Sequence, residues 1–335
     1  MQKTIFVVDD SLSNLSLAEE ALENHYRVIT LSSADKMYKT LEKLVPDLIL
    51  LDIAMPDESG FDAMKKLKSI KAYSDIPVIF LTALTDTFNE ALGIELGAID
   101  FITKPFSEAV LLNRVRNHIQ IDELVHKRTE QLNSMKDSIV LTMSSLVESR
   151  DVFTGGHIER TTKFLKILLG AMIDHGVYID EIDEWDVDSF VSSARLHDVG
   201  KIYVADAILN KPKSLSQAEF ESIKTHSSEG EKIIDQMIKQ TGDMEFLHSA
   251  KLVAAYHHER WDGSGYPYGL SGEEIPLPGR LMAIIDVYDA LVSERPYKKP
   301  VAHEDAVKTI ISESGTHFDP KIIEVFRDVN DRFAL

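Results

Sequence analysis

A chain of 335 residues is long enough for about two domains, because a typical domain spans roughly 100–150 residues. With 44% hydrophobic residues, 27% charged residues and no cysteine, the composition excludes a disordered or fibrous protein, disulfide bonds, cysteine nucleophiles and thiolate metal sites. The formal net charge of −19 would repel a phosphate backbone, so we expect no binding to nucleic acid. No apolar run reaches the roughly 18 residues that span a bilayer, so we expect no membrane insertion and a cytoplasmic location.

The N-terminal third of the chain alternates short apolar runs with amphipathic stretches. Continuous apolar strands that alternate with helices are typical of a parallel sheet covered on both faces. We therefore predict an α/β domain with a five-stranded parallel sheet, whose functional residues lie where the strands end. The predicted strands are 5–8, 28–29, 48–51, 78–81 and 101–102.

Polar and charged side chains directly follow several of these strands. They are Asp9 and Asp10 after the first, Asp52 after the third, Thr82 after the fourth and Lys104 after the fifth. Three carboxylates in one crevice require a cation, and hard oxygen ligands suit Mg²⁺. One carboxylate can then attack a phosphoryl group, with Lys104 paired to the anion. As an alternative, each Asp only starts a turn or caps the following helix.

These residues carry a resemblance to the receiver domain of response regulators. The matching motifs are Val7-Val8-Asp9-Asp10, Leu50-Leu51-Asp52, Thr82-Ala83 and Lys104-Pro105-Phe106. The resemblance implies a flavodoxin-like (βα)5 fold over 1–118 and phosphorylation at Asp52 by a cognate sensor histidine kinase. It also implies that Asp9 and Asp10 bind Mg²⁺ and that Thr82 and Lys104 contact the phosphoryl oxygens. Phe101 stands where the family places an aromatic switch residue, although it is equally a candidate for an ordinary core aromatic.

A connector follows over 119–146. The chain has no Gly or Pro between Phe106 and Phe153, so we predict that the last helix of the first domain continues as one long helix. Apolar residues at steps of three and four form the seam of a possible coiled coil, through which two copies would form a homodimer. As an alternative, this face packs on its own domain. The seam comprises Ile121, Val125, Leu132, Met135, Ile139 and Leu146, with Arg128 and Thr142 at intervening positions.

The third region, 147–335, has the periodicity of helices and no convincing pair of strands. It predicts an all-α bundle, a fold that builds metal sites from side chains on facing helices. The expected helices are 138–148, 161–175, 189–196, 217–240, 248–258 and 280–292.

Five histidines in this region stand in series with carboxylates. The set is His157, His197, Asp198, His226, His257, His258 and Asp286. A single histidine of this kind is more often an ordinary core or surface residue, so the prediction depends on the neighbours. Five imidazoles and two carboxylates are too many ligands for one ion and suit two ions of Fe, Mn, Co, Ni or Zn that share a carboxylate. Two such ions clamp phosphoryl oxygens and activate water, which predicts phosphate ester hydrolysis.

The C-terminal region closely resembles the HD-GYP subfamily of HD-domain phosphohydrolases, through His197-Asp198 and the loop from His257 to Pro267. The resemblance implies one metal held by His157, His197, Asp198 and Asp286, and a second held by Asp198, His226, His257 and His258. Fe or Mn is the favoured metal. Lys201 would assist at the scissile phosphate, with Arg295, Lys298 and the Gly265-Tyr266-Pro267 loop binding substrate. The implied reaction opens cyclic di-GMP to linear pGpG, which some members cut further to GMP.

One position departs from the pattern of members that bind a third metal. They carry Glu four residues before the first His, where this chain has Phe153, which cannot ligate a metal. We therefore predict two metals, and slow or absent cleavage of pGpG to GMP. Two alternatives to the leading hypothesis stay open: a scaffold or cyclic-dinucleotide-binding protein with little turnover, and a hydrolase of a different cyclic dinucleotide.

Overall fold

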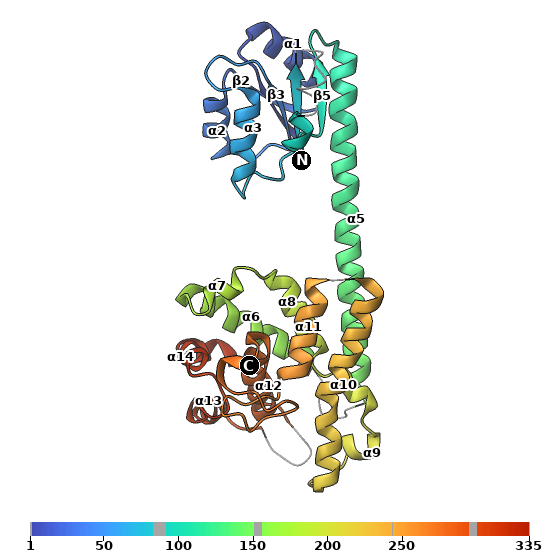
Figure 1. Cartoon of the computed structure of the whole chain (residues 1–335), viewed down its shortest axis with the longest axis vertical. Helices are drawn as coiled ribbons and strands as arrows, with labels where there is room; N and C mark the ends of the chain where they lie inside the picture. Colours follow the sequence, from blue (N-terminus) through green and yellow to red (C-terminus); the bar gives the residue numbers. More distant parts are fainter. Residues whose placement is uncertain (1, 83–91, 151–155, 243, 295–299, 335) are drawn as a thin grey trace. The chain divides into compact units, whose positions relative to one another are not determined.

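The computed structural model describes residues 2–82, 92–150, 156–242, 244–294 and 300–334. The chain divides into two compact units, Met1–Gln131 and Leu132–Leu335, which we describe separately. Figure 1 shows an α/β unit that contains the N-terminus and a helical unit that contains the C-terminus. None of the helices in the described part of the chain combines the length and the apolar character needed to cross a bilayer.

The first unit is built on a five-stranded, fully parallel sheet with the strand order β2-β1-β3-β4-β5. Its strands are β1 (Thr4–Val8), β2 (Arg27–Leu31), β3 (Leu48–Asp52), β4 (Val78–Thr82) and β5 (Asp100–Thr103). The three central strands β1, β3 and β4 are buried along their whole length, which explains their continuous apolar sequences. The predicted parallel sheet is confirmed.

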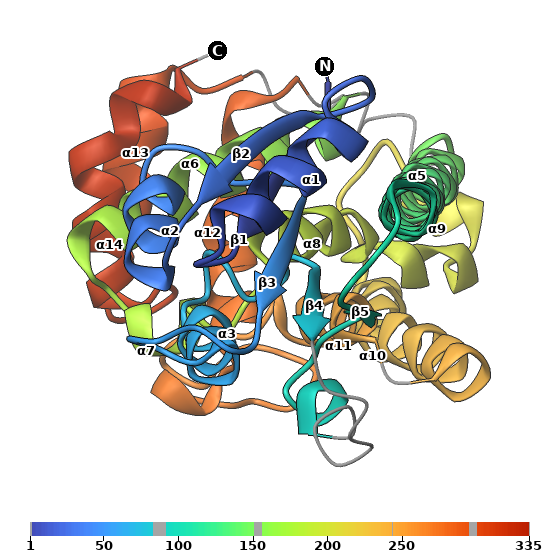
Figure 2. The same ribbon diagram turned by 90° about the horizontal axis from the view of Figure 1, so that it is seen from above.

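Helices cover both faces of this sheet. The helices α2 (Ala34–Leu41) and α3 (Gly60–Ser69) pack on one face. The helix α1 (Leu12–Leu22) and the first turns of α5 pack on the other face. Figure 2, the view from above, shows α1 and α3 on opposite sides of the sheet. This doubly covered sheet brings the carboxyl ends of the strands to one edge.

The helix α5 runs without a break over Glu108–Glu148, as the missing Gly and Pro residues predict. Its first turns bury Leu111 and Val115 against the sheet of the first unit. Its last turns bury Val140 and Val147 in the second unit. The long connector helix is therefore confirmed.

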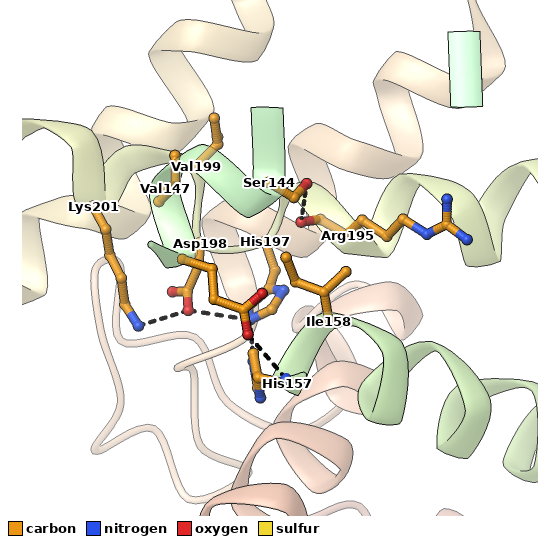
Figure 3. A pocket seen from close by; sticks show the side chains of 10 residues that line it. Ser144, Val147, His157, Ile158, Arg195, His197, Asp198, Val199 and Lys201 are labelled. Carbon is orange, nitrogen blue, oxygen red and sulfur yellow. Dashed lines mark hydrogen bonds and ion pairs between the residues drawn. The ribbon is translucent and has the colours of Figure 1, made fainter. Parts of the chain in front are cut away.

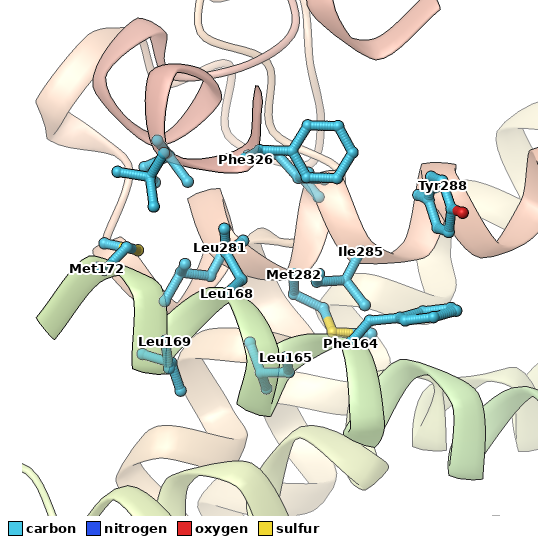
Figure 4. Close-up of a cluster of buried hydrophobic side chains, with 14 of the residues drawn as sticks. Phe164, Leu165, Leu168, Leu169, Met172, Leu281, Met282, Ile285, Tyr288 and Phe326 are labelled. Carbon is cyan, nitrogen blue, oxygen red and sulfur yellow. The ribbon is translucent and has the colours of Figure 1, made fainter. Parts of the chain in front are cut away.

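The second unit is all-helical around one main hydrophobic core. The core joins α6, α12 and α14 through large side chains that include Phe164, Leu168, Leu281, Tyr288 and Phe326 (Figure 4). The helices are α6 (His157–His175), α7 (Ile179–Ile182), α8 (Val187–Ser193), α9 (Asp206–Leu209), α10 (Gln217–Thr241), α11 (Glu245–Tyr256), α12 (Leu277–Val292), α13 (His303–Ser312) and α14 (Pro320–Val329). Short 3₁₀ turns are η1 (Ala194–Leu196), η2 (Val199–Tyr203), η3 (Gly272–Glu274) and η4 (Asn330–Phe333). The predicted all-α bundle is confirmed.

The expected helix bounds differ from the observed ones at several ends. The helix α6 begins at His157 rather than 161, after Gly156 in a left-handed conformation. The helix α11 ends at Tyr256, so His257 and His258 lie in the turn that follows it. The helices α13 and α14 were not among the expected elements. Asp319 accepts a hydrogen bond from the Lys321 backbone N–H and Pro320 opens α14, so a start signal was present in the sequence.

Candidate metal centre

The first group of candidate ligands comprises His157, His197 and Asp198, which each offer an atom within 4.8 Å of the others. His157 is the first residue of α6, and His197 and Asp198 form the link between η1 and η2. The Nε2 atoms of His157 and His197 lie 3.2 Å apart. Figure 3 shows these three side chains converging on one pocket together with Lys201.

The second group comprises His226, His257 and His258, which also lie within 4.8 Å of one another. His226 is on α10, and the other two follow α11. The Nε2 atoms of His226 and His257 lie 3.2 Å apart. Both of these side chains are almost fully buried.

Asp198 lies between the two groups. Its Oδ2 is 3.3 Å from Nε2 of His197, and its Oδ1 is 3.4 Å from Nε2 of His226 and 3.9 Å from that of His257. One carboxylate oxygen thus faces each group, the arrangement of a bridging ligand. The Oδ1 of Asp286, on α12, lies 3.6 Å from Nε2 of His157 and so joins the first group. The structure therefore brings all seven predicted ligands together.

The histidine rings are held so that Nε2 faces inward. Nδ1 of His197 lies 2.9 Å from the Ala194 carbonyl oxygen, and Nδ1 of His226 lies 2.6 Å from that of Ile223. Nδ1 of His257 lies 2.9 Å from the Val253 carbonyl oxygen. A carbonyl only accepts, so each neutral ring carries its proton on Nδ1 and directs the Nε2 lone pair at its neighbours. Facing lone pairs repel unless a cation lies between them, so this donor set fits metal ions.

The electrostatic environment keeps most of these rings neutral. Burial, reinforced by His197 and His226, lowers the pKa of His257 to about 3. Burial also lowers the pKa of His226 and of His258. Burial alone would lower the pKa of His197 too, but the Asp198 carboxylate outweighs it and raises that pKa. A neutral imidazole is the form that binds metal.

Lys201 places a positive charge beside the shared carboxylate of Asp198. Its Nζ lies 2.7 Å from Oδ2 of Asp198, three residues earlier in the chain. Burial alone would raise the pKa of Asp198, but Lys201 and His197 hold it well below its usual range. Asp198 is therefore an ionised carboxylate with an ammonium group beside it.

Gly200 allows the Asp198 segment to approach α10. A Cβ atom at this position would lie 1.9 Å from the carbonyl oxygen of His226 and 2.5 Å from the backbone nitrogen of Gly230. Only glycine fits where two backbones pass this closely. This contact places Asp198 beside His226.

The Gly265-Tyr266-Pro267 loop borders the second group. The ring of Tyr266 lies 4.8 Å from that of His258, centroid to centroid. A Cβ atom on Gly265 would lie 2.3 Å from the backbone nitrogen of Arg260, so the loop also depends on a close backbone approach. The predicted substrate ligands Arg295 and Lys298 lie outside the described residues, as does Phe153.

Asp289 and Glu259 support the site, and the sequence reasoning missed both. Oδ2 of Asp289 lies 2.7 Å from Nδ1 of His157, and Arg160 Nε donates to the other oxygen at 2.6 Å. The buried Glu259 accepts hydrogen bonds from the backbone N–H groups of Tyr268 at 2.7 Å and Leu270 at 3.1 Å, and so holds the loop. Their sequence signals are weak: one lies a helical turn after Asp286 and the other directly follows the histidine pair.

A second acidic site lies at the carboxyl edge of the sheet in the first unit. Asp9, Asp10 and Asp52 offer oxygens within 4.8 Å of one another. Lys104 Nζ lies 2.6 Å from Oδ2 of Asp9 and 2.7 Å from Oδ1 of Asp52. Thr82 is buried at the end of β4, and its carbonyl accepts the backbone N–H of Lys104. The five residues therefore lie at neighbouring strand ends, as predicted.

Phe101 is half-buried in the first unit. Its ring stacks on Phe80 at a centroid distance of 5.6 Å and an angle of 29°. A Cβ atom on Gly93 would lie 2.4 Å from the Phe101 ring, so the ring packs against the backbone at that glycine. In this structure Phe101 belongs to the core cluster of the sheet, and its role as a switch stays a prediction.

Comparison with known proteins identifies two domain families along the chain. The HD domain family matches residues 142–322, and the response regulator receiver domain family matches residues 5–116. A probable cyclic di-GMP phosphodiesterase of Vibrio cholerae is 38% identical over 97% of this chain and 77% of its own length. A cyclic di-GMP phosphodiesterase response regulator of Xanthomonas campestris is 30% identical over 96% of this chain and 86% of its own.

A further relative is named for a different substrate. A 3'3'-cGAMP-specific phosphodiesterase of Vibrio cholerae is 34% identical over 61% of this chain and 38% of its own length. The two family matches together span most of the chain, and two of these relatives align over nearly all of it. This chain belongs to the response regulators that join a receiver domain to an HD-domain phosphodiesterase.

Proposed function

We propose that this protein hydrolyses cyclic di-GMP to linear pGpG at a centre of two divalent transition metals, under the control of phosphorylation at Asp52. The observation that carries the proposal is the placing of Asp198, with one oxygen toward each histidine group. The inward Nε2 atoms of those groups support it further. Fe or Mn is the metal that we favour for these ligands.

Each of the two histidine groups would hold one metal ion. His157, His197 and Asp286 would hold one ion, and His226, His257 and His258 the other, with Asp198 shared. When bound, two such ions would lower the pKa of a bound water and stabilise negative charge on the phosphoryl oxygens. Water adds to phosphorus, one bridging P–O bond of the ring breaks, and the leaving 3′ oxygen takes up a proton. Lys201, beside Asp198, is placed to stabilise negative charge on the reacting phosphate.

The substrate side of the proposal depends on the loop residues. Arg295 and Lys298 would bind the phosphates of the cyclic dinucleotide, and Gly265, Tyr266 and Pro267 would shape the pocket beside His258. Phe153 offers no ligand for a third ion, so the proposal includes slow or absent cleavage of pGpG to GMP.

A substrate panel tests this assignment against its alternatives. We would compare kcat/KM for cyclic di-GMP and 3'3'-cGAMP on one metal-loaded preparation, with a binding titration of each ligand. The proposal expects cyclic di-GMP to be the better substrate. Faster turnover of 3'3'-cGAMP would favour the hydrolase of another cyclic dinucleotide. Tight binding with no turnover of either ligand would favour the binding or scaffold protein.

The receiver half of the proposal places the phosphoryl group on Asp52, with Mg²⁺ bound by Asp9 and Asp10. A cognate sensor histidine kinase in the cytoplasm would supply the phosphoryl group. We expect the full chain with Mg²⁺ and acetyl phosphate to acquire one hydroxylamine-sensitive phosphoryl group, and Asp52→Asn to acquire none, because an amide is not a nucleophile. Intact-mass spectrometry measures both. Equal labelling of the variant would place the phosphoryl group elsewhere.

We also propose a homodimer through the seam on α5. Leu132, Met135 and Leu146 expose 66%, 61% and 63% of their surface, whereas Val140, on another face of the helix, is buried. A helix with an exposed apolar seam of this spacing favours pairing with a second copy.

Substitution in the seam gives a direct prediction. Leu132→Arg would place a charge in the seam of both copies. We therefore expect the dissociation constant of the dimer to rise by about tenfold or more. Sedimentation velocity over a range of protein concentrations measures this. Ser134→Arg adds the same charge at an exposed position outside the seam and is expected to leave the dimer intact. A wild type that stays monomeric at all concentrations would contradict the proposed dimer.

A further inference from the structure

The first turn of α6 is capped from a different helix. The N-cap residue Gly156 has no side chain, and the backbone N–H of His157 donates to Oε1 of Glu148 at 2.9 Å. Glu148 is the last residue of α5, and it lines the same pocket as His157, His197 and Asp198. A carboxylate is favourable here, because the N-terminal end of a helix carries partial positive charge and unpaired N–H groups.

The same end of α5 holds the segment that carries the other ligands of the first group. Ser144 Oγ donates to the carbonyl of Arg195 at 2.8 Å, two residues before His197. Val140 packs in one cluster with Leu196 and Val199, on either side of the His197–Asp198 pair.

Arg150, just beyond α5, continues this attachment after the pair. Its guanidinium donates to the carbonyls of Ile202 at 2.7 Å and Val204 at 2.9 Å. These carbonyls follow Lys201 in the chain. The segment from Arg195 to Val204 is therefore attached to the end of α5 on both sides of the metal ligands.

His157 itself is fixed at two points. Its backbone is held by Glu148, and its Nδ1 lies 2.7 Å from Asp289 on α12. With both contacts in place, Nε2 faces His197 and Asp286. Loss of the Glu148 contact would release the first residue of α6 while leaving the ring bonded to Asp289.

We propose that Glu148 is a positioning residue of the metal centre, which holds His157 in place for the first ion and has little effect on the second. The proposal rests on the two-metal centre put forward above. The end of the connector helix α5 would then affect the affinity of the first metal site through Glu148. The second group lies on α10 and after α11, and is therefore expected to keep its affinity.

The test uses three variants of the full chain. Glu148→Ala removes the acceptor. Glu148→Gln removes the charge but retains an amide oxygen that accepts the N–H of His157. Glu159→Gln is the matched control, since Glu159 is an exposed carboxylate in the same first turn of α6. The readouts are the two stepwise Mn²⁺ dissociation constants, from competition with a chromophoric chelator, and the Tm of the metal-free protein.

We expect Glu148→Ala to weaken one of the two Mn²⁺ sites about 10- to 100-fold, the range found for partners that orient metal ligands, while the other site changes less than about threefold. Glu148→Gln and Glu159→Gln are expected to bind both ions within about threefold of wild type. Equal weakening of both sites by Glu148→Ala, with a large fall in Tm, would show general loss of structure and overturn the proposal. So would unchanged binding, or a Gln variant as weak as the Ala variant. A wild type that binds fewer than two ions would instead contradict the proposed metal centre itself.

Discussion

Replacement of Asp198 by Asn is expected to abolish the activity, with a fall in turnover of about three orders of magnitude or more, because catalysis by a pair of ions depends on both being held together. In the structure each carboxylate oxygen faces one histidine group. Asn offers one oxygen, and its NH₂ group would face the other ion. We expect both Mn²⁺ dissociation constants to rise by more than about tenfold.

The fold should survive this substitution, because Asn has nearly the same shape as Asp. The Tm of the metal-free variant therefore separates a lost metal site from a lost structure. Asp188→Asn is a matched control, since the side chain of Asp188 is 90% exposed on α8. It is expected to bind metal and turn over substrate like wild type. Two ions bound to Asp198→Asn with wild-type affinity would contradict the bridging role.

Replacement of Gly200 by Ala is expected to have the second large effect. The added methyl group would lie 1.9 Å from the His226 carbonyl oxygen. Each of the two backbones carries a proposed metal ligand, His226 on one side and Asp198, two residues before Gly200, on the other. We expect the free energy of unfolding to fall by about 3 kcal/mol, at the upper end for overpacking of a buried contact. Metal affinity should fall as well, because Asp198 would move away from His226.

Gly170 provides the comparison for this variant. It lies inside α6, and a Cβ atom there would have no neighbour within 4 Å. Gly170→Ala is therefore expected to raise the free energy of unfolding by about 0.5–1 kcal/mol, the ordinary gain of Ala over Gly in a helix. Calorimetry of both metal-free variants measures the contrast. A Gly200→Ala protein as stable as Gly170→Ala would show that the two backbones do not approach as described.

The sheet was predictable because each strand contains a short apolar run. All five expected strands lie within two residues of the observed bounds, and the central ones are fully buried. The polar residues that follow them meet because parallel strands end at one edge. Asp9 and Asp52 meet around Lys104 for this reason.

The metal ligands were predictable from residue type and from the resemblance, but their orientation was not. The hydrogen bonds that turn His197 and His226 inward involve backbone carbonyls, which every residue has. No sequence pattern shows which backbone carbonyl accepts the hydrogen bond from the histidine Nδ1. The observed facing of the Nε2 atoms therefore adds physical support that the sequence lacked.

The supporting carboxylates could not be predicted, because neither contact follows a local sequence motif. Asp289 reaches back 132 residues to His157, and Glu148 caps a helix that begins nine residues later. The start of α6 was placed too late because the helix has no capping side chain of its own. The usual sequence signal is a Ser, Thr, Asp or Asn at the N-cap, and here that position is Gly156.

A time course of cyclic di-GMP turnover tests the proposed phosphodiesterase activity most directly. The purified full chain would be reconstituted without oxygen with Fe²⁺ or Mn²⁺, beside a His197→Ala, Asp198→Ala double variant, while pGpG and GMP are followed by chromatography. We predict that wild type converts cyclic di-GMP to pGpG, that GMP forms slowly or not at all, and that the double variant forms neither. Wild-type protein that carries two metal ions and leaves cyclic di-GMP unconsumed would contradict the central claim.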